Sequence, residues 1–182
     1  MSSINFSEAY SNFFTKVEGY DLFDPNLSKE MRDEFLCSWL HSAVSDPYIM
    51  NLFSSISITD PEVIVTEDDE GQEVTEEKDG VIEYELKYKN NDVADEHFVI
   101  EVLGYSMALA WVTPKVNSLV NIQMLVCDGQ TRFFSQANHL SALKLVKDDL
   151  ESRRDHIIAM RGVSNNTYLD GTSPVATSRK NK

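Results

Sequence analysis

One apolar segment, from Phe98 to Val112, constrains the fold of this chain more than any other feature. It is broken only at four positions, namely Glu101, Gly104, Tyr105 and Ser106. The segment is too long for a typical strand and too short to span a bilayer, so it predicts a buried central helix. We expect this helix to cover residues 92–112 and to end at Thr113-Pro114, because proline cannot continue the hydrogen-bond ladder.

Small residues recur at helical spacing inside this segment. Gly104 and Ala108 lie one turn apart, and Trp111 follows them. Small side chains let a second helix approach closely, either within the chain or from a neighbouring subunit. We therefore take Gly104, Ala108 and Trp111 as candidate residues for subunit or helix packing.

Further helices are predicted from the spacing of apolar residues at three and four positions. They cover residues 7–16, 28–45 and 136–160, with a short helix after Pro47 and a segment at 115–126 that is compatible with another. Cys127-Asp128-Gly129-Gln130 is expected to form a turn, Ser135 to cap the last helix and Gly162 to stop it. Both tryptophans, Trp39 and Trp111, are expected in the core.

Residues from about 56 to 89 alternate between apolar and polar, which is typical of strands. The pattern predicts strands near 62–66 and 81–88, joined by the loop Glu67–Gly80. The fold class is therefore mainly α with one β-hairpin (α+β), a helical bundle of about four to five helices with a long acidic hairpin tip and an extended C-terminal tail. Residues 1–162 are expected to form a single domain, with the hairpin inserted at 56–89, and residues 163–182 the tail.

Nearly all of the net charge of −14 lies in one part of the chain, because residues 60–101 carry 16 acidic and 3 basic side chains. Such a surface disfavours non-specific binding of nucleic acid, which depends on Lys and Arg. The predicted hairpin holds the candidate acidic residues: Glu67, Asp68, Asp69, Glu70, Glu73, Glu76 and Glu77. They could be a solvated surface that keeps the protein soluble, or a surface that faces a basic partner or passing DNA.

The last twenty residues are polar with few apolar anchors, a composition typical of segments that fold only on a partner. Their larger apolar residues and terminal cations are the candidate partner-binding residues: Tyr168, Leu169, Val175, Arg179, Lys180 and Lys182.

No catalytic or metal-binding motif is evident in the sequence. The four histidines are isolated, Cys37 reads as a small buried hydrophobe, and Cys37 and Cys127 form neither a ligand pair nor a disulfide framework, which favours a reducing compartment. There is no phosphate-binding glycine loop, nucleophile elbow or Ca²⁺-loop spacing. We therefore predict a protein that is not an enzyme and uses no cofactor or metal, and we expect no membrane span and no secretory signal.

Two short stretches carry a resemblance to a known family. Trp111-Val112-Thr113-Pro114-Lys115 closes the apolar helix, and Ser135-Gln136-Ala137-Asn138-His139-Leu140 opens the last one. Taken with the predicted helix pair in residues 28–53, they make residues 28–160 resemble the small neck proteins of tailed bacteriophages, of the head–tail connector or adaptor type.

This resemblance implies a structural virion protein, a subunit of a ring of about twelve copies that lies under the portal and joins the capsid to the tail. The implied partners are the portal protein, other neck or tail-completion proteins, further copies of the chain, and viral DNA that passes without specific binding; no membrane is implied. The implied location is the head–tail interface of the virion, after assembly in the host cytoplasm.

Two other classes stay open. One is an acidic phage-encoded binding protein that imitates the charge of DNA to inhibit a host protein. The other is an enzyme with an unrecognised site. The cations Arg179, Lys180 and Lys182 favour the connector, because a DNA mimic has little use for them.

Overall fold

The computed structural model describes residues 1–18, 26–67, 73–125 and 130–164. Over these ranges the chain is mainly helical with a small antiparallel sheet, which confirms the predicted fold class. The helices are α1 (Phe6–Lys16), α2 (Lys29–Val44), α3 (Pro47–Met50), α4 (Asp92–Leu125) and α5 (Gln130–Ser164). The strands are β1 (Ser2–Asn5), β2 (Phe53–Thr59), β3 (Glu62–Glu67), β4 (Glu73–Lys78) and β5 (Val81–Leu86).

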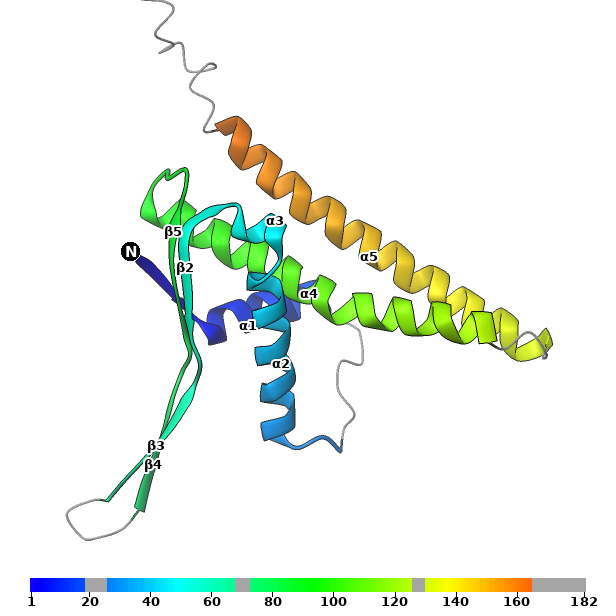
Figure 1. Cartoon of the computed structure of the whole chain (residues 1–182), viewed down its shortest axis with the longest axis horizontal. Coiled ribbons are helices and arrows are strands. Elements are labelled where there is room, and N and C mark those ends of the chain that lie inside the picture. Colours follow the sequence, from blue (N-terminus) through cyan, green and yellow to red (C-terminus); the bar gives the residue numbers. More distant parts are fainter. Residues whose placement is uncertain (19–25, 68–72, 126–129, 165–182) are drawn as a thin grey trace, which may run out of the picture.

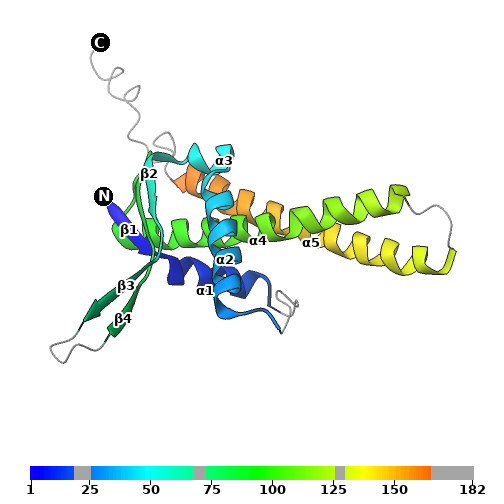
Figure 2. The same ribbon diagram turned by 60° about the horizontal axis from the view of Figure 1, so that its bottom comes forward.

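The elements form a body with two projections. Helices α1, α2 and α3 and the strands β1, β2 and β5 surround the first half of α4, and the paired helices α4 and α5 extend from this body on one side (Figure 1). The ribbon of β3 and β4 extends on the opposite side, and a view turned by 60° shows the same arrangement (Figure 2). None of the helices in the described ranges has an apolar stretch long enough to cross a membrane.

The apolar segment forms the middle of α4 and the centre of the hydrophobic core, as predicted. Its fully buried side chains are Val99, Val102, Leu103, Met107, Ala108 and Val112. Helices α1 and α2 pack against this part of α4, and α5 adds Leu140, Leu143 and Leu150 to the same core. The middle of α4 is therefore buried on nearly every side, which explains why the apolar segment shows no polar face.

The predicted end of this helix at Thr113-Pro114 is wrong. Helix α4 continues through Pro114 to Leu125, so residues 115–125 belong to it and do not form the separate helix with which the segment 115–126 was compatible. An internal proline costs about 3 kcal/mol because its nitrogen cannot donate to the carbonyl four residues earlier. Val112 and Val116, both buried in the core on either side of Pro114, offset this cost by packing.

Helix α5 is longer than predicted at both ends. It begins at Gln130, so Ser135 lies inside the helix and does not cap it, and it passes Gly162 to end at Ser164. Most of the predicted turn at 127–130 lies outside the described residues. The period of apolar residues located the middle of α5 but not its ends, because helix ends depend on few contacts.

Two arginines of α5 hold it against the body. Arg161 donates to Asp95 Oδ1 at 2.6 Å and to the Tyr88 carbonyl at 2.8 Å, and its guanidinium lies over the Phe98 ring. The Arg161 and Asp95 side chains are only 11% and 7% exposed. Asp95 also accepts hydrogen bonds from the backbone N–H of Asn90, so this ion pair is buried and its carboxylate has several donors.

The second arginine, Arg154, joins α5 to α3. It donates to Asp46 at 3.3 Å and lies over the ring of Tyr48. Asp46 also caps α3 by accepting from the Tyr48 N–H. The Arg154 side chain is only 12% exposed, although it stands among the many charged residues of α5.

The sheet has β5 at its centre, paired antiparallel with β1 on one edge and β2 on the other. Ile82, Tyr84 and Leu86 alternate inward from β5 into the core, as the sequence predicts, but Tyr88 lies beyond the strand and is exposed. The predicted register is wrong: β5 pairs with residues 53–59, whereas β3 pairs with β4, which was predicted to be loop. Strand β1 was missed, because four residues with one buried side chain give no alternating pattern.

Glu101 interrupts the apolar segment because it binds α1. Its carboxylate accepts hydrogen bonds from Lys16 Nζ at 2.8 and 3.0 Å and from Asn12 Nδ2 at 2.9 Å. Burial alone raises the pKa of Glu101, but the donors from Lys16 and Asn12 outweigh burial and hold the pKa below its ordinary value. Lys16 also lies over the ring of Tyr105, so one lysine fixes α1 on α4 through two residues.

Gly104 lies where α1 crosses α4. A Cβ atom at this position would lie only 3.0 Å from the Asn12 side-chain carbon and 3.3 Å from its backbone carbonyl carbon. The close helix packing predicted at Gly104 is therefore a contact between α1 and α4 of the same chain.

We expect Gly104→Ala to lower the free energy of unfolding by about 1–3 kcal/mol, because α1 must move to admit the methyl group. Gly162→Ala is the matched control, since a Cβ there meets no atom within 4 Å. It should raise the free energy of unfolding by about 0.5–1 kcal/mol through helix propensity. Urea titrations of both variants measure the two values, and equal effects would contradict the close approach of α1.

The two tryptophans differ in burial. Trp111 is 3% exposed and belongs to the core, as predicted. Trp39 was also expected in the core but is only partly buried, where it packs against Phe13 and stacks on the exposed Phe35. The N-terminal half of α2 therefore carries apolar side chains, including Met31, that face outward.

Candidate functional site

The acidic ribbon of β3 and β4 holds the predicted acidic residues on strands rather than on a loop. Glu67 ends β3, and Glu73, Glu76 and Glu77 lie on β4, with Glu67 paired opposite Glu73. Asp68, Asp69 and Glu70 lie outside the described residues. Charged residues rarely form strands, but a ribbon whose two faces are solvated needs no alternating pattern.

This ribbon makes few stabilising contacts with the other described residues. None of the described side chains between residues 60 and 78 belongs to the hydrophobic core. Val63 is 62% exposed and Ile64 36% exposed, although both are β-branched residues that favour burial. An ion pair between Lys29 and Glu77 at 3.0 Å joins the ribbon to α2, but both side chains are well exposed, so the pair contributes little.

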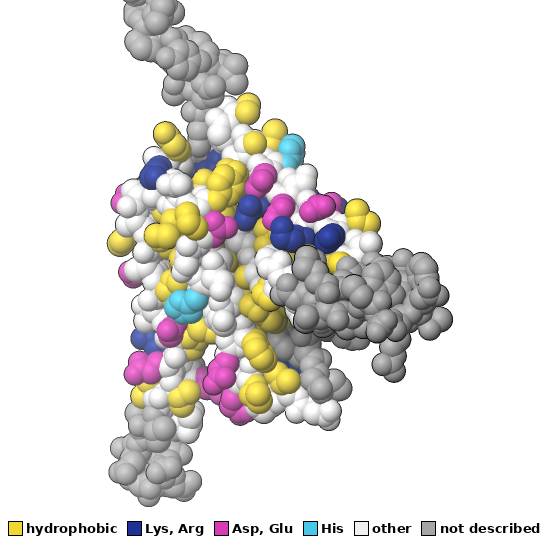
Figure 3. Space-filling model, turned by 45° about the vertical axis from the view of Figure 1, so that its right-hand side comes forward, with side chains coloured by type: hydrophobic (Ala, Val, Ile, Leu, Met, Phe, Trp, Pro, Cys, Tyr) yellow, Lys and Arg dark blue, Asp and Glu magenta, His cyan; other side chains and the backbone are white. Residues whose placement is uncertain are grey.

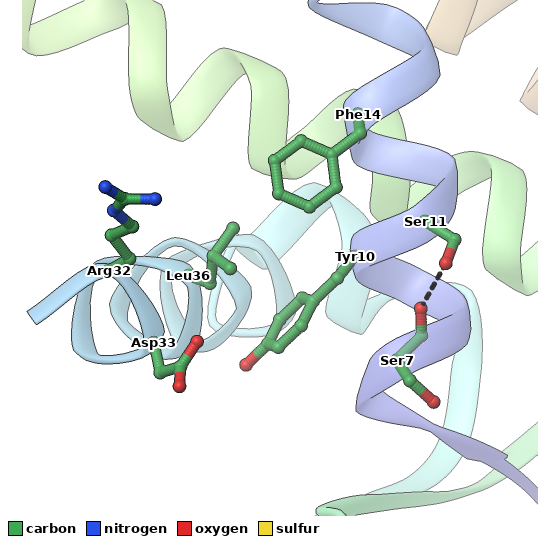
Figure 4. Close-up of a pocket in the computed structure, with 7 residues that line it drawn as sticks. All are labelled: Ser7, Tyr10, Ser11, Phe14, Arg32, Asp33 and Leu36. Carbon is green, nitrogen blue, oxygen red and sulfur yellow. Dashed lines mark hydrogen bonds between the residues drawn. The ribbon is translucent and has the colours of Figure 1, made fainter. Parts of the chain in front are cut away.

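A groove with a volume of about 490 Å³ lies between α1 and α2. Tyr10 and Phe14 extend from α1 toward Leu36 of α2, and Arg32 and Asp33 of α2 lie at its edge (Figure 4). Ser11 donates to the Ser7 carbonyl and keeps its hydroxyl on the helix.

The surface around this groove is rich in apolar side chains. Phe14, Met31 and Phe35 are all exposed, on α1 and α2. The space-filling view shows hydrophobic side chains next to acidic ones on the face of the body that it presents (Figure 3). Apolar side chains that gather on a surface and are edged by charge are typical of a contact with another protein.

A third group of side chains joins α2 to the joint between β2 and β3. Cys37 Sγ, His41 Nε2 and an oxygen of Asp60 all lie within 4.8 Å of one another. His41 Nε2 is 2.7 Å from Asp60 Oδ1, and Cys37 Sγ is 3.7 Å from the same oxygen. The sequence treated Cys37 and His41 separately, although their spacing of four residues on a predicted helix already placed them on one face.

The Cys37 group lies in a region of negative electrostatic potential. Burial raises the pKa of the Cys37 thiol, and the nearby Asp60 carboxylate raises it further. Burial also raises the pKa of Tyr10, with smaller contributions from Cys37, Asp79, Asp33 and Asp60. The tyrosine of the α1–α2 groove and the Cys37 group therefore lie in the same region of negative potential.

The remaining candidate residues fall in two places. Gly104, Ala108 and Trp111 all lie in the buried part of α4, where they pack inside the chain. Tyr168, Leu169, Val175, Arg179, Lys180 and Lys182 lie outside the described residues, so their predicted role in partner binding stays a prediction.

The described residues therefore hold three candidate features, namely the β3–β4 ribbon, the α1–α2 groove and the Cys37 group. The α1–α2 groove and the Cys37 group share helix α2, whereas the ribbon is formed by β3 and β4. Within the described ranges the Cys37 group is the one cluster of three metal-ligating side chains. Searches with the whole chain found no matching protein-family model, no similar curated protein and no similar solved structure.

Proposed function

We propose that this chain is a structural subunit of the head–tail connector of a tailed bacteriophage, forming a ring under the portal. The observation that carries the proposal is the β3–β4 ribbon, which projects from the body and leaves Val63 and Ile64 exposed. A lone two-stranded hairpin is marginally stable in water, so a ribbon of this kind gains stability from a neighbouring chain.

A closed ring of identical subunits would supply such a neighbouring chain to the ribbon of every copy. When a projection on one side of a subunit binds a different surface of the next copy, the contact is heterologous, and it closes into a ring if the rotation allows. The chain offers a projecting ribbon and, elsewhere on the body, a groove lined by Phe14 and Leu36. The second projection, formed by α4 and α5, extends away from the ribbon. The two projections can therefore contact different partners.

The acidic charge of the chain also supports a position next to passing DNA without binding to it. Residues 60–101 have a large excess of carboxylates, and several lie on the exposed surface of the ribbon and sheet. DNA carries about one negative charge per 1.7 Å of helix axis, so acidic walls repel it and let it pass.

Because the ribbon is expected to join neighbouring copies, the proposal can be tested by measuring the size of the assembly. We expect the full chain to form a closed ring with the portal protein of the same phage, visible by electron microscopy and mass photometry. Val63→Lys with Ile64→Lys should abolish the ring and leave the helical circular dichroism unchanged, because neither side chain contributes to the core. Val93→Lys is the control, since Val93 is equally exposed at the start of α4 but far along the chain from the ribbon.

Two outcomes would contradict the proposal. A chain that stays monomeric with the portal at micromolar concentration is not a connector subunit. A monomer that instead binds a basic host protein, and loses that binding when the ribbon carboxylates are neutralised, would be the DNA-charge mimic. The exposed Glu62 and Glu77 of the ribbon are what favours this second candidate.

A further inference from the structure

We propose that Cys37, His41 and Asp60 form a binding site for a transition-metal ion of the Zn²⁺ class, at the root of the β3–β4 ribbon. The inference does not depend on the connector role, because it uses only the placement of these three side chains. It also goes against the expectation from the sequence, in which the histidines and cysteines had no ligand spacing.

The ligand atoms converge on one point. The thiol, the imidazole nitrogen and the carboxylate oxygen lie within 4.8 Å of one another, and both Cys37 and His41 are directed at Asp60 Oδ1. Neighbouring ligand atoms of a tetrahedral zinc ion lie roughly 3.3–3.7 Å apart, given bonds of about 2.0–2.3 Å. The sulfur–oxygen distance of 3.7 Å already fits, and the nitrogen–oxygen distance of 2.7 Å must open by roughly half an ångström.

Two separate elements bring these groups together. Cys37 and His41 lie one turn apart on α2, so their side chains leave the same face of the helix. Asp60 lies between β2 and β3, directly before Pro61, at the point where the sheet gives way to the ribbon. A site with ligands on both elements is fixed by the fold and not by the sequence of one helix alone.

The donor set selects the kind of metal. A thiolate, an imidazole and one carboxylate suit Zn²⁺ and its neighbours, whereas Ca²⁺ and Mg²⁺ take oxygen ligands. His41 is 42% exposed and Asp60 59% exposed, so a fourth position is open to water or to a ligand from another chain. Three protein ligands with one open position are a common zinc arrangement.

A reactive cysteine is a poorer interpretation of the same geometry. A nucleophilic thiolate needs a cation or a helix N-terminus beside it, whereas Cys37 Sγ lies 3.7 Å from the carboxylate of Asp60 and donates to it. Two negative groups facing each other repel, and a divalent cation between them removes that repulsion. When the metal binds, the thiol loses its proton and the imidazole carries its remaining proton on Nδ1.

The bound ion would tie the ribbon to α2. The joint at Asp60-Pro61 is otherwise held to α2 by the His41 contact and, farther along, by the exposed Lys29–Glu77 pair. A metal at the joint would therefore fix the angle at which the ribbon leaves the body.

The test uses the full, reduced chain after treatment with a chelator. We expect equilibrium dialysis to give one bound Zn²⁺ per chain, and Co²⁺ as a probe to give a thiolate-to-cobalt absorption band. Cys37→Ser, His41→Ala and Asp60→Asn should each weaken binding at least about 10-fold, and Cys37→Ser should remove the band. Cys127→Ser, His156→Ala and Asp148→Asn are the matched controls and should bind as the parent chain does.

A second readout leaves the three ligands intact. In the Cys127→Ser variant, Zn²⁺ should slow alkylation of Cys37 by iodoacetamide, whereas Mg²⁺ should not. The proposal is overturned if less than one equivalent of Zn²⁺ binds, if the control variants lose binding as the ligand variants do, or if Zn²⁺ leaves the alkylation rate unchanged. These results do not bear on ring formation, so the site and the connector role fail separately.

Discussion

Replacing Arg161 with alanine should lower the free energy of unfolding by about 3–5 kcal/mol, measured by urea titration of the full chain. The reason is the carboxylate of Asp95, which is 7% exposed and would stay buried without its cation. The variant also leaves the Tyr88 carbonyl without this donor and removes the guanidinium from the face of Phe98. Since Arg161 lies near the end of α5, the last turns of that helix should lose their contacts with Asp95 and Phe98 at the start of α4.

Arg153→Ala is the matched control for this loss. Arg153 lies on the same helix and pairs with Asp149 four residues earlier, but both side chains are more than half exposed. An exposed pair of this kind contributes about 0.3–0.5 kcal/mol, so the control should be close to neutral. Arg161→Met with Asp95→Leu should cost less than Arg161→Ala, because it removes the buried charge together with its partner. Similar losses for Arg161→Ala and Arg153→Ala would show that the Asp95 pair is not buried in solution.

Trp111→Ala should cost about 3–5 kcal/mol, because it opens a cavity in the most buried part of α4. Trp111 is 3% exposed and also lies under the ammonium group of Lys115, at 4.5 Å from its ring centroid. The cavity cannot close easily, since Val112 and Val116 are held in the core on either side of Pro114.

Trp39→Ala is the internal comparison, since Trp39 is only partly buried against Phe13 and Phe35. It should cost about 1–2 kcal/mol, in proportion to the smaller apolar area it removes from water. Urea titrations followed by far-ultraviolet circular dichroism measure both variants. If Trp39→Ala proved the more destabilising of the two, the order of burial along α2 and α4 would be wrong.

The buried elements of the fold were predictable because burial leaves a pattern in one stretch of sequence. The apolar segment within α4 and the alternation of Ile82, Tyr84 and Leu86 on β5 both identify their element and the face it buries. Serine is a common helix N-cap, and Ser28 caps α2 by accepting a hydrogen bond from the Met31 N–H. Local rules suffice where the stabilising contact is local or where every neighbour is apolar.

The features that fix the elements to one another were not predictable in the same way. Arg154 and Arg161 look like other charged residues of α5, and only the fold brings them to Asp46 and Asp95. The register of β2 with β5 depends on Asp60-Pro61 dividing one long hairpin into two ladders, which alternation alone does not reveal. The partner of Cys37 and His41 lies 19 residues beyond His41, at that same division.

The pairing of β1 with β5 has a consequence for how the chain is made on the ribosome. Ile4 pairs with Ile82, so the first strand emerges long before its partner exists. Closing a contact across that much chain costs entropy and comes late in folding. Phe6 and Phe13, which are fully buried in the finished body, must stay exposed until α4 has also left the exit tunnel. The interval of translation before α4 has emerged, up to Leu125, is thus the one in which this protein is open to aggregation and to chaperones.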